Sequence, residues 1–368
     1  MCVIAGYTGT KRAAPILIEM LKKMEYFDSG YATGIATIHE GKLYYAKAKG
    51  GIEMLLKMTD ALNLPGTTGL IHSRPGFDFF NTTFPYVDDA GEYALMGNGT
   101  VSGTNTEEFY AEMRTIMDEL FDRGIVAPNS RDNLFGMGYS KLAHTKDGKP
   151  FYPPYSVHVL SVGDKVKNTP PEEMKAAVAQ AVKETHERIP TDNVTLTVHA
   201  KLPDTVTVCT ISRPMSVLEA DSECYLASCA IAFPEDVHGK ITHLPQCSLS
   251  QITPKGIEMI ADHLNGVRCE QVTEEMVDAY VKAITEQTKE RALSTYEMKM
   301  PAVFHEPMVD CDRFRVEGGR LKPHMPVMYR ALYRLYKEGK LSFYTGEVYA
   351  RDVAWPSVDC YFTKFRVI

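Results

Sequence analysis

The spacing of apolar residues along the chain predicts a fold in which β-strands and amphipathic helices are mixed. The first ten residues read as a strand, because a continuous apolar run opens the chain. Residues 12–24 instead carry apolar side chains three and four positions apart, which predicts a helix with one buried face. The other elements expected in the first hundred residues are strands at 34–38, 42–47, 68–73 and 93–97 and a short helix at 52–62.

The middle of the chain predicts one helix, a sheet edge, a second helix and then a strand-rich block. Thr104-Asn105-Thr106-Glu107 is a capping box that begins the first helix, which ends at Gly124. Residues 155–162 read as a sheet edge, and Thr169-Pro170-Pro171 opens the second helix. The strand-rich block, in which apolar residues alternate with a period of two, comprises 193–198, 205–208, 225–230 and 240–252.

Beyond residue 265 the pattern changes to helices followed by a hairpin. Thr273 caps a helix that runs to about residue 290, and a second helix with an apolar face spans 326–338. Two strand-like pieces follow, at 341–349 and 358–367. This order, with a local surplus of basic residues, resembles a winged helix. Because small helix–hairpin units more often pack against a parent domain than bind DNA, we expect this unit to pack against the preceding domain.

The composition is that of an ordinary soluble globular protein, and it narrows the classes of partner. Of the 368 residues, 44% are hydrophobic and 24% are charged. No stretch of about eighteen apolar residues occurs, so we expect no membrane span. The chain opens directly with a strand, without a leader, which favours the cytoplasm. The net charge of −7 argues against nucleic acid as a partner.

Cysteine and histidine are too dispersed to predict a disulfide framework or a metal site. None of the 8 cysteines belongs to a C-x-x-C pair, and the 11 histidines include no H-E-x-x-H motif. We therefore assign no metal and no other cofactor.

Cys2 is the residue that offers the most specific chemistry, because it follows the first methionine. If Met1 is removed, a thiol and a free α-amine belong to the same residue. Such an amine has a pKa of about 8, which suits a general base at neutral pH, so it can accept the thiol proton. The alternative is that Cys2 is a small buried side chain that opens a strand.

Short motifs after Cys2 follow one another in the order and spacing of a known family. Gly69-Leu70-Ile71-His72-Ser73-Arg74 is similar to a Gly-x-x-His-Thr-Arg strand, and Gly97-Asn98-Gly99 to a His-Asn-Gly turn. The other matching segments are Cys2–Tyr7, Ala14–Tyr26, Gly34–Ala36, Asn81 with Pro85, and the end of a helix, at 118–124, that leads to Asp132. Over roughly the first 135 residues the chain thus resembles class II glutamine amidotransferases, most nearly the glutaminase domain of glucosamine-6-phosphate synthase.

The resemblance implies an α+β fold of the N-terminal-nucleophile hydrolase type. This fold is a four-layer αββα sandwich, in which two sheets stack face to face between layers of helices. We expect the amidotransferase domain at residues 1–265 and a small helix-plus-hairpin, winged-helix-like domain at 266–368. The implied partners are L-glutamine and a synthase subunit that accepts ammonia. We also expect a homo-oligomer without membrane association.

The resemblance also implies which residues carry the chemistry. Cys2 is the nucleophile that forms a γ-glutamyl thioester, and Asn98 and Gly99 form the oxyanion hole. By itself, Asn98-Gly99 could equally be an ordinary hairpin turn. His72 lies in the motif, but we interpret it as a buried strand histidine, because the α-amine already supplies a base.

Three further residues are implied to bind the substrate. Arg74 grips the α-carboxylate of glutamine with its planar guanidinium, Asp132 takes the α-ammonium, and Ser73 lies beside them. The alternatives from local sequence are a surface arginine at the end of a strand for Arg74 and a helix N-cap for Asp132.

Three departures from the family pattern keep other functions open. Val3 replaces a glycine, Gly97 replaces a histidine, and residues 74–78 replace the Arg-Trp-Ala-Thr-His loop that closes over glutamine. The sequence therefore favours a glutaminase that supplies ammonia to a synthase. The alternatives are an amidohydrolase that acts on another amide and a non-catalytic binding or regulatory protein.

Overall fold

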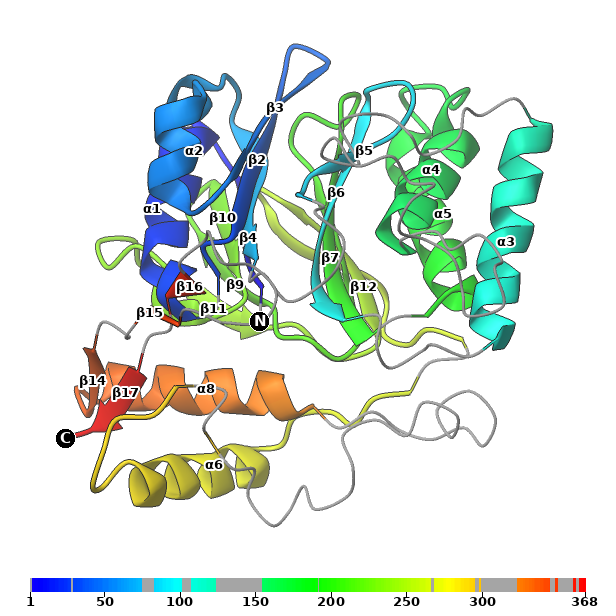
Figure 1. Ribbon diagram of the computed structural model, residues 1–368. Helices are drawn as coiled ribbons and strands as arrows, with labels where there is room; N and C mark the ends of the chain where they lie inside the picture. Colours follow the sequence, from blue (N-terminus) through cyan, green and yellow to red (C-terminus); the bar gives the residue numbers. More distant parts are fainter. Residues whose placement is uncertain are drawn as a thin grey trace.

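A computed structural model of the chain places the elements described below (Figure 1). The residues that it describes are 2–25, 27, 29–74, 83–100, 107–123, 154–190, 192–265, 268–294, 298, 323–344, 348–349, 360–361 and 364–368. Thr104, Gly124, Asn81, Asp132 and most of the segment 74–78 therefore lie outside the described residues.

The opening strand lies in the middle of the first sheet, because it pairs on both sides with antiparallel neighbours. Ala5 is opposite Ile71 on one side and opposite Ala227 on the other. Among the described residues this sheet has the strand order β11-β9-β10-β1-β4-β2-β3. Its strands are β1 (Val3–Thr8), β2 (Ala32–His39), β3 (Lys42–Lys49), β4 (Thr68–Arg74), β9 (Ser216–Ala220), β10 (Glu223–Ala227) and β11 (Lys240–His243).

A second antiparallel sheet faces the first. Within the described ranges its strand order is β13-β12-β8-β7-β6-β5. Its strands are β5 (Tyr86–Val87), β6 (Tyr93–Thr100), β7 (Asp192–His199), β8 (Val206–Thr210), β12 (Ser248–Thr253) and β13 (Gly256–Ala261). The strand-rich block predicted from the period-two pattern supplies β7, β8 and β12 of this sheet, and it also supplies β10 and β11 of the first sheet.

Helices cover the outer face of each sheet, which completes the predicted αββα sandwich. Figure 1 shows α1 and α2 beside the first sheet and α3, α4 and α5 beside the second. These helices are α1 (Ala13–Met24), α2 (Ile52–Met58), α3 (Glu107–Asp122), α4 (Pro154–Val166) and α5 (Met174–Arg188). Short 3-10 turns are η1 (Glu25–Phe27), η2 (Ala61–Asn63) and η4 (Ala230–Ala232).

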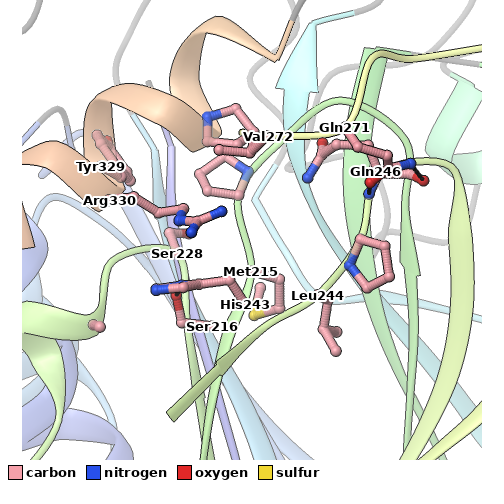
Figure 2. Close-up of a pocket in the computed structure, with 14 residues that line it drawn as sticks. Met215, Ser216, Ser228, His243, Leu244, Gln246, Gln271, Val272, Tyr329 and Arg330 are labelled. Carbon is pink, nitrogen blue, oxygen red and sulfur yellow. Dashed lines mark hydrogen bonds between the residues drawn. The ribbon is translucent and has the colours of Figure 1, made fainter. Parts of the chain in front are cut away.

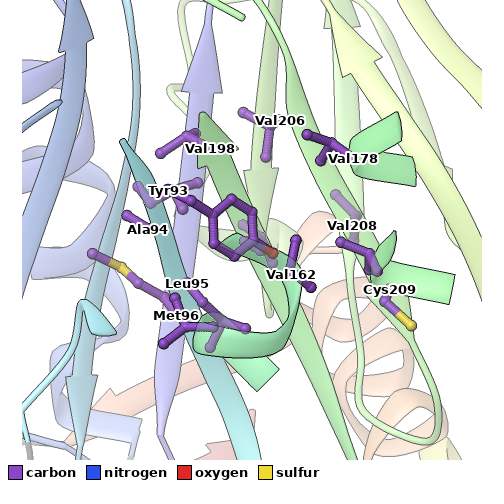
Figure 3. Packing of buried hydrophobic residues seen from close by; sticks show 14 of the residues in the cluster. Tyr93, Ala94, Leu95, Met96, Val162, Val178, Val198, Val206, Val208 and Cys209 are labelled. Carbon is purple, nitrogen blue, oxygen red and sulfur yellow. The ribbon is translucent and has the colours of Figure 1, made fainter. Parts of the chain in front are cut away.

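The prediction of a sheet edge at 155–162 was wrong, since these residues belong to helix α4. Every residue from Tyr155 to Gly163 is buried, because α4 lies between α3, α5 and the second sheet. In this valine-rich run the buried positions include the polar residues Ser156, His158 and Ser161, so the apolar residues show no helical period and the pattern cannot distinguish a buried helix from a strand. Figure 3 shows Val162 of α4 packed near Leu95 of β6.

The two faces of β1 belong to two different hydrophobic clusters. Val3, Ala5 and Tyr7 pack in a cluster with α1, whereas Ile4 packs in the cluster between the two sheets. This alternation is the expected property of a strand, whose successive side chains point to opposite faces. Both faces of the strand that follows Cys2 are therefore fixed by packing.

The C-terminal elements pack beneath the first sheet (Figure 1). They are α6 (Glu274–Gln287), α8 (His324–Lys337), β14 (Leu341–Tyr344), β15 (Val348–Tyr349), β16 (Cys360–Tyr361) and β17 (Lys364–Val367). Thr273 caps α6 as predicted, because its hydroxyl accepts a hydrogen bond from the Met276 N–H at 3.3 Å. Met328, Leu332 and Leu335 of α8 are buried in the cluster that contains α1.

Candidate active site

The antiparallel register of β1 and β4 sets the position of Cys2. Val3 lies opposite Ser73 and Ile4 opposite His72, so the same register continued by one residue puts Cys2 beside Arg74. Cys2 is half-buried, just ahead of the first residue of β1. Because side chains alternate along a strand, Cys2 shares the face of Ile4, which is the face toward the second sheet.

Arg74 and His72 occupy that same face of β4. Arg74 is the last residue of the strand and only 6% exposed, which is inconsistent with a surface arginine. His72 is fully buried, as predicted, and its ring lies 4.4 Å from that of Phe84. Burial first, and then the positive charge of Arg74, lower the pKa of His72 well below its usual value. His72 is therefore neutral at physiological pH.

Ser73 lies on the opposite face of β4, away from Arg74. Its hydroxyl accepts a hydrogen bond from the Gly30 N–H at 3.0 Å and lies 2.9 Å from the hydroxyl of Thr33. These contacts hold β4 to β2 and to the segment before it. The structure does not bring the Ser73 side chain together with Arg74 and Cys2.

Asn98 and Gly99 lie inside β6, so the alternative of a hairpin turn is wrong. Asn98 pairs with Val194 and Gly99 with Asn193 of β7, about a hundred residues further along the chain. Gly99 has a φ of 150°, a backbone conformation that residues with a side chain rarely adopt. The backbone conformation at position 99 therefore favours glycine.

The amide of Asn98 is buried and held from the first sheet. Its side chain is 0% exposed, and its Nδ2 donates a hydrogen bond to the Ser228 Oγ at 3.3 Å. Its Oδ1 has no hydrogen-bond partner among the described residues. Because an amide nitrogen carries two protons, Nδ2 keeps a second donor beyond the bond to Ser228.

Ser228 connects Asn98 to the strand that follows Cys2, a role that the sequence did not reveal. Its Oγ accepts from the Ile4 N–H at 3.2 Å and donates to the Ile4 carbonyl at 3.3 Å. The Ser228 N–H also donates to the Ile4 carbonyl, at 3.0 Å. One hydroxyl thus fixes the spacing between β6 and the beginning of β1. The sequence feature that could have pointed to Ser228 is a serine directly after a buried strand.

Two of the departures from the family motif are packing changes on the far faces of their strands. Val3 is 1% exposed and packs in the cluster with α1, opposite the face of Ile4. A Cβ on Gly97 would overlap the ring of Tyr155, which comes from the first turn of α4. The Tyr155 hydroxyl also donates to the Gly99 carbonyl at 3.5 Å. The Tyr155 ring of α4 therefore fills the space that a side chain at position 97 would need.

The described part of the chain holds no group of three His, Cys, Asp or Glu side chains that could bind a metal ion. No helix in that part is long and apolar enough to cross a bilayer. Asp132 and Met1 lie outside the described residues, so the roles assigned to them stay predictions. The groups that do converge are a half-buried thiol, a buried guanidinium and a buried amide, and this set suits a substrate with an amide and a carboxylate.

Comparison with known proteins agrees with the resemblance. No model of a known protein family matches the chain. The chain is 35% identical over 136 residues to glutamine–fructose-6-phosphate aminotransferase (isomerizing) of Pyrococcus horikoshii, covering 36% of this chain and 21% of that enzyme. Against the enzyme of Chlorobaculum tepidum, the identity is 25% over 328 residues, covering 87% of this chain and 46% of the relative. The chain thus spans about a fifth of the length of the first of these relatives.

Solved structures show the same fold. Glutamine phosphoribosylpyrophosphate amidotransferase of B. subtilis superimposes with a TM-score of 0.52 at 14% identity, covering 79% of this chain and 59% of that one. The predicted resemblance to class II glutamine amidotransferases and the predicted sandwich of the N-terminal-nucleophile hydrolase type are confirmed.

Proposed function

Taking the homology to class II glutamine amidotransferases as the premise, we propose that the chain hydrolyses the side-chain amide of L-glutamine. The products are glutamate and ammonia, and a synthase is the acceptor of the ammonia. The observation that carries the proposal is the β1–β4 register, which sets Cys2 beside Arg74 on the face toward Asn98. The residues of this chain do not identify which synthase accepts the ammonia.

The reaction begins at Cys2. Once no residue precedes it, its α-amine takes the thiol proton, and the sulfur attacks the amide carbon of glutamine. Collapse of the tetrahedral intermediate forms the thioester, and the proton passes from the amine to the departing ammonia. Water then attacks the thioester and releases glutamate. Because burial lowers the pKa of His72 well below its usual value, its ring is a weak base, and the α-amine remains the proposed base.

Asn98 and Gly99 stabilise the oxyanion of that intermediate. The second proton of Asn98 Nδ2 and the Gly99 N–H are the proposed donors. The bond from Asn98 to Ser228 supports this role, because it fixes the amide relative to β1 before any substrate binds. Preorganised donors of this kind need no rearrangement as the negative charge develops.

Arg74 is the proposed ligand of the α-carboxylate. A guanidinium buried at the end of β4 can form two parallel hydrogen bonds with a carboxylate. Asp132 remains the proposed partner of the α-ammonium. Ser73 supports Arg74 indirectly, because its hydroxyl ties β4 to Thr33 and Gly30.

The test is ammonia release from L-glutamine by protein whose first residue is shown by intact mass to be Cys2. We expect turnover in this protein and a loss of more than about 1,000-fold in Cys2→Ala. Cys269→Ala is the matched control, since Cys269 is also half-buried but lies outside the site, and it should keep full activity. Absence of ammonia with a free Cys2 amine, or equal turnover by Cys2→Ala, would overturn the proposal.

A further inference from the structure

A cavity lies between α8 and the lower end of the first sheet, with a volume of about 170 Å³ (Figure 2). Its polar lining consists of Ser216, His243, Gln246, Gln271, Tyr329 and Arg330, and Ser228 forms part of its wall. Cys2, Arg74 and Asn98 do not line it. This cavity is therefore separate from the site proposed for glutamine, although the two share Ser228.

Among the described residues that line the cavity, Arg330 is the one with a charged side chain. Arg330 reaches in from α8 and is partly buried, and burial lowers its pKa, which marks a guanidinium that has lost part of its hydration. Its ion pair with Glu274 lies at the exposed rim. No acidic side chain is among the described residues that line the cavity. An anion inside would restore favourable interactions to the buried part of the guanidinium.

Neutral polar groups surround Arg330. The Nδ1 of His243 lies 2.8 Å from the Ser216 hydroxyl. Burial, followed by the charge of Arg330, lowers the pKa of His243 to about 4, so this ring is neutral at physiological pH. The other lining residues are apolar and limit the size of a ligand: Pro214, Met215, Ala230, Leu244, Pro245, Val272 and Pro326.

Gln246 carries a side-chain oxygen that accepts no hydrogen bond from the described residues. Its backbone is held on both sides by Gln271, which accepts from the Gln246 N–H at 2.9 Å and donates to the Gln246 carbonyl at 2.8 Å. The side chain is 2% exposed, and its Oε1 has no hydrogen-bond partner among the described residues. A buried acceptor left without a partner is unfavourable, so a ligand that brings an N–H or O–H would be stabilised here.

We propose that this cavity binds a small carboxylic acid that also carries a hydrogen-bond donor, in other words a hydroxy acid or an amino acid. Arg330 holds the carboxylate, and Gln246 accepts the hydrogen bond from the hydroxyl or amino group. The apolar wall restricts the site to ligands of about the size of one amino acid.

Isothermal titration calorimetry with L-malate and succinate tests the proposal, because these two acids differ only by the hydroxyl group. We expect L-malate to bind about tenfold more tightly than succinate. Arg330→Gln should weaken L-malate binding by at least about tenfold. Arg334→Gln, also on α8, is the matched control. It too loses an ion pair with Glu274 of α6, but Arg334 does not line the cavity, so this variant should bind as the native chain does.

Two results would overturn the site. One is no heat of binding for L-malate up to about 10 mM, and the other is equal binding by Arg330→Gln and Arg334→Gln. Circular dichroism of both variants establishes that each is folded. Because no glutamine is present in this titration, its outcome is independent of whether the chain is a glutaminase.

The cavity also has a consequence for catalysis, which rests on the proposed function. Ser228 is in the wall of the cavity and accepts the hydrogen bond that holds Asn98. A ligand that shifts Ser228 therefore changes the position of the proposed oxyanion donor. We expect saturating L-malate to change kcat for L-glutamine in the native chain and in Arg334→Gln but not in Arg330→Gln. An unchanged kcat with L-malate bound would overturn this coupling.

Discussion

Asn98 shows how one side chain of the second sheet is positioned by a residue of the first. Its Nδ2 binds Ser228, and the Ser228 hydroxyl is itself fixed by two hydrogen bonds to Ile4. The Asn98 Oδ1 is buried and has no partner among the described residues. A buried polar atom without a partner lowers stability, and a bound substrate that donates a hydrogen bond can remove that cost.

Asn98→Ala should lower kcat for L-glutamine by about 100-fold to 1,000-fold and change KM little, because the lost donor acts on the transition state. Steady-state ammonia release over a range of glutamine concentrations measures both constants. Asn63→Ala, at an exposed asparagine in η2, is the control. A rise in KM at constant kcat would mean instead that Asn98 binds the ground state of the substrate.

Sequence motifs supply the candidate site residues, but not the hydroxyl that connects Asn98 to β1. Cys2, Arg74 and Asn98 stand in short motifs that can be recognised locally. Ser228 lies 224 residues from its partner Ile4, so no window of sequence contains both. For the same reason Asn98-Gly99 could be mistaken for a turn, since its strand partner β7 is distant in the chain.

At the scale of elements, local signals predicted the helices with caps and the strands with alternation. The Thr273 cap of α6 and the amphipathic face of α1 are examples, because each depends on residues within one or two turns. Helix α4 was missed because burial on all sides removed its period. Its first turn supplies Tyr155, which packs against β6 on the face opposite Asn98.

Gly97→Ala should destabilise the fold by about 1–3 kcal/mol, because the added methyl group overlaps the Tyr155 ring and forces β6 and α4 apart. Chemical denaturation measures the change in the free energy of unfolding. In a Tyr155→Ala background the same substitution should cost less than half as much, because the ring is gone. Equal costs in the two backgrounds would show that the contact between β6 and α4 is not the cause.

At the scale of the whole molecule, the C-terminal helices and the first sheet share one hydrophobic cluster. Leu332 and Met328 of α8 belong to the same cluster as Val3 of β1 and Leu17 of α1. The boundary that we propose at residue 265 therefore separates two units in sequence, while their apolar side chains are continuous in space. Such continuity favours cooperative unfolding.

Leu332→Ala should lower the free energy of unfolding by about 2–5 kcal/mol, since the side chain is fully buried. Calorimetry should show one transition, shifted to lower temperature. Leu160→Ala, in the hydrophobic cluster that also contains Ile4, should shift that same transition. If Leu332→Ala instead separates an early transition from an unchanged later one, the C-terminal unit unfolds on its own.

The central position of β1 also has a consequence for the order of events during synthesis. The pairing of β1 with β10 cannot form until Ser228 has been synthesised, because Ile4 and Ser228 are 224 residues apart. At a synthesis rate of about 5–20 residues per second, this interval lasts roughly 10 to 45 s. For that time β1 lacks its neighbour on the β10 side, so the end of the strand that carries Cys2 stays uncovered there until Ser228 emerges from the ribosome.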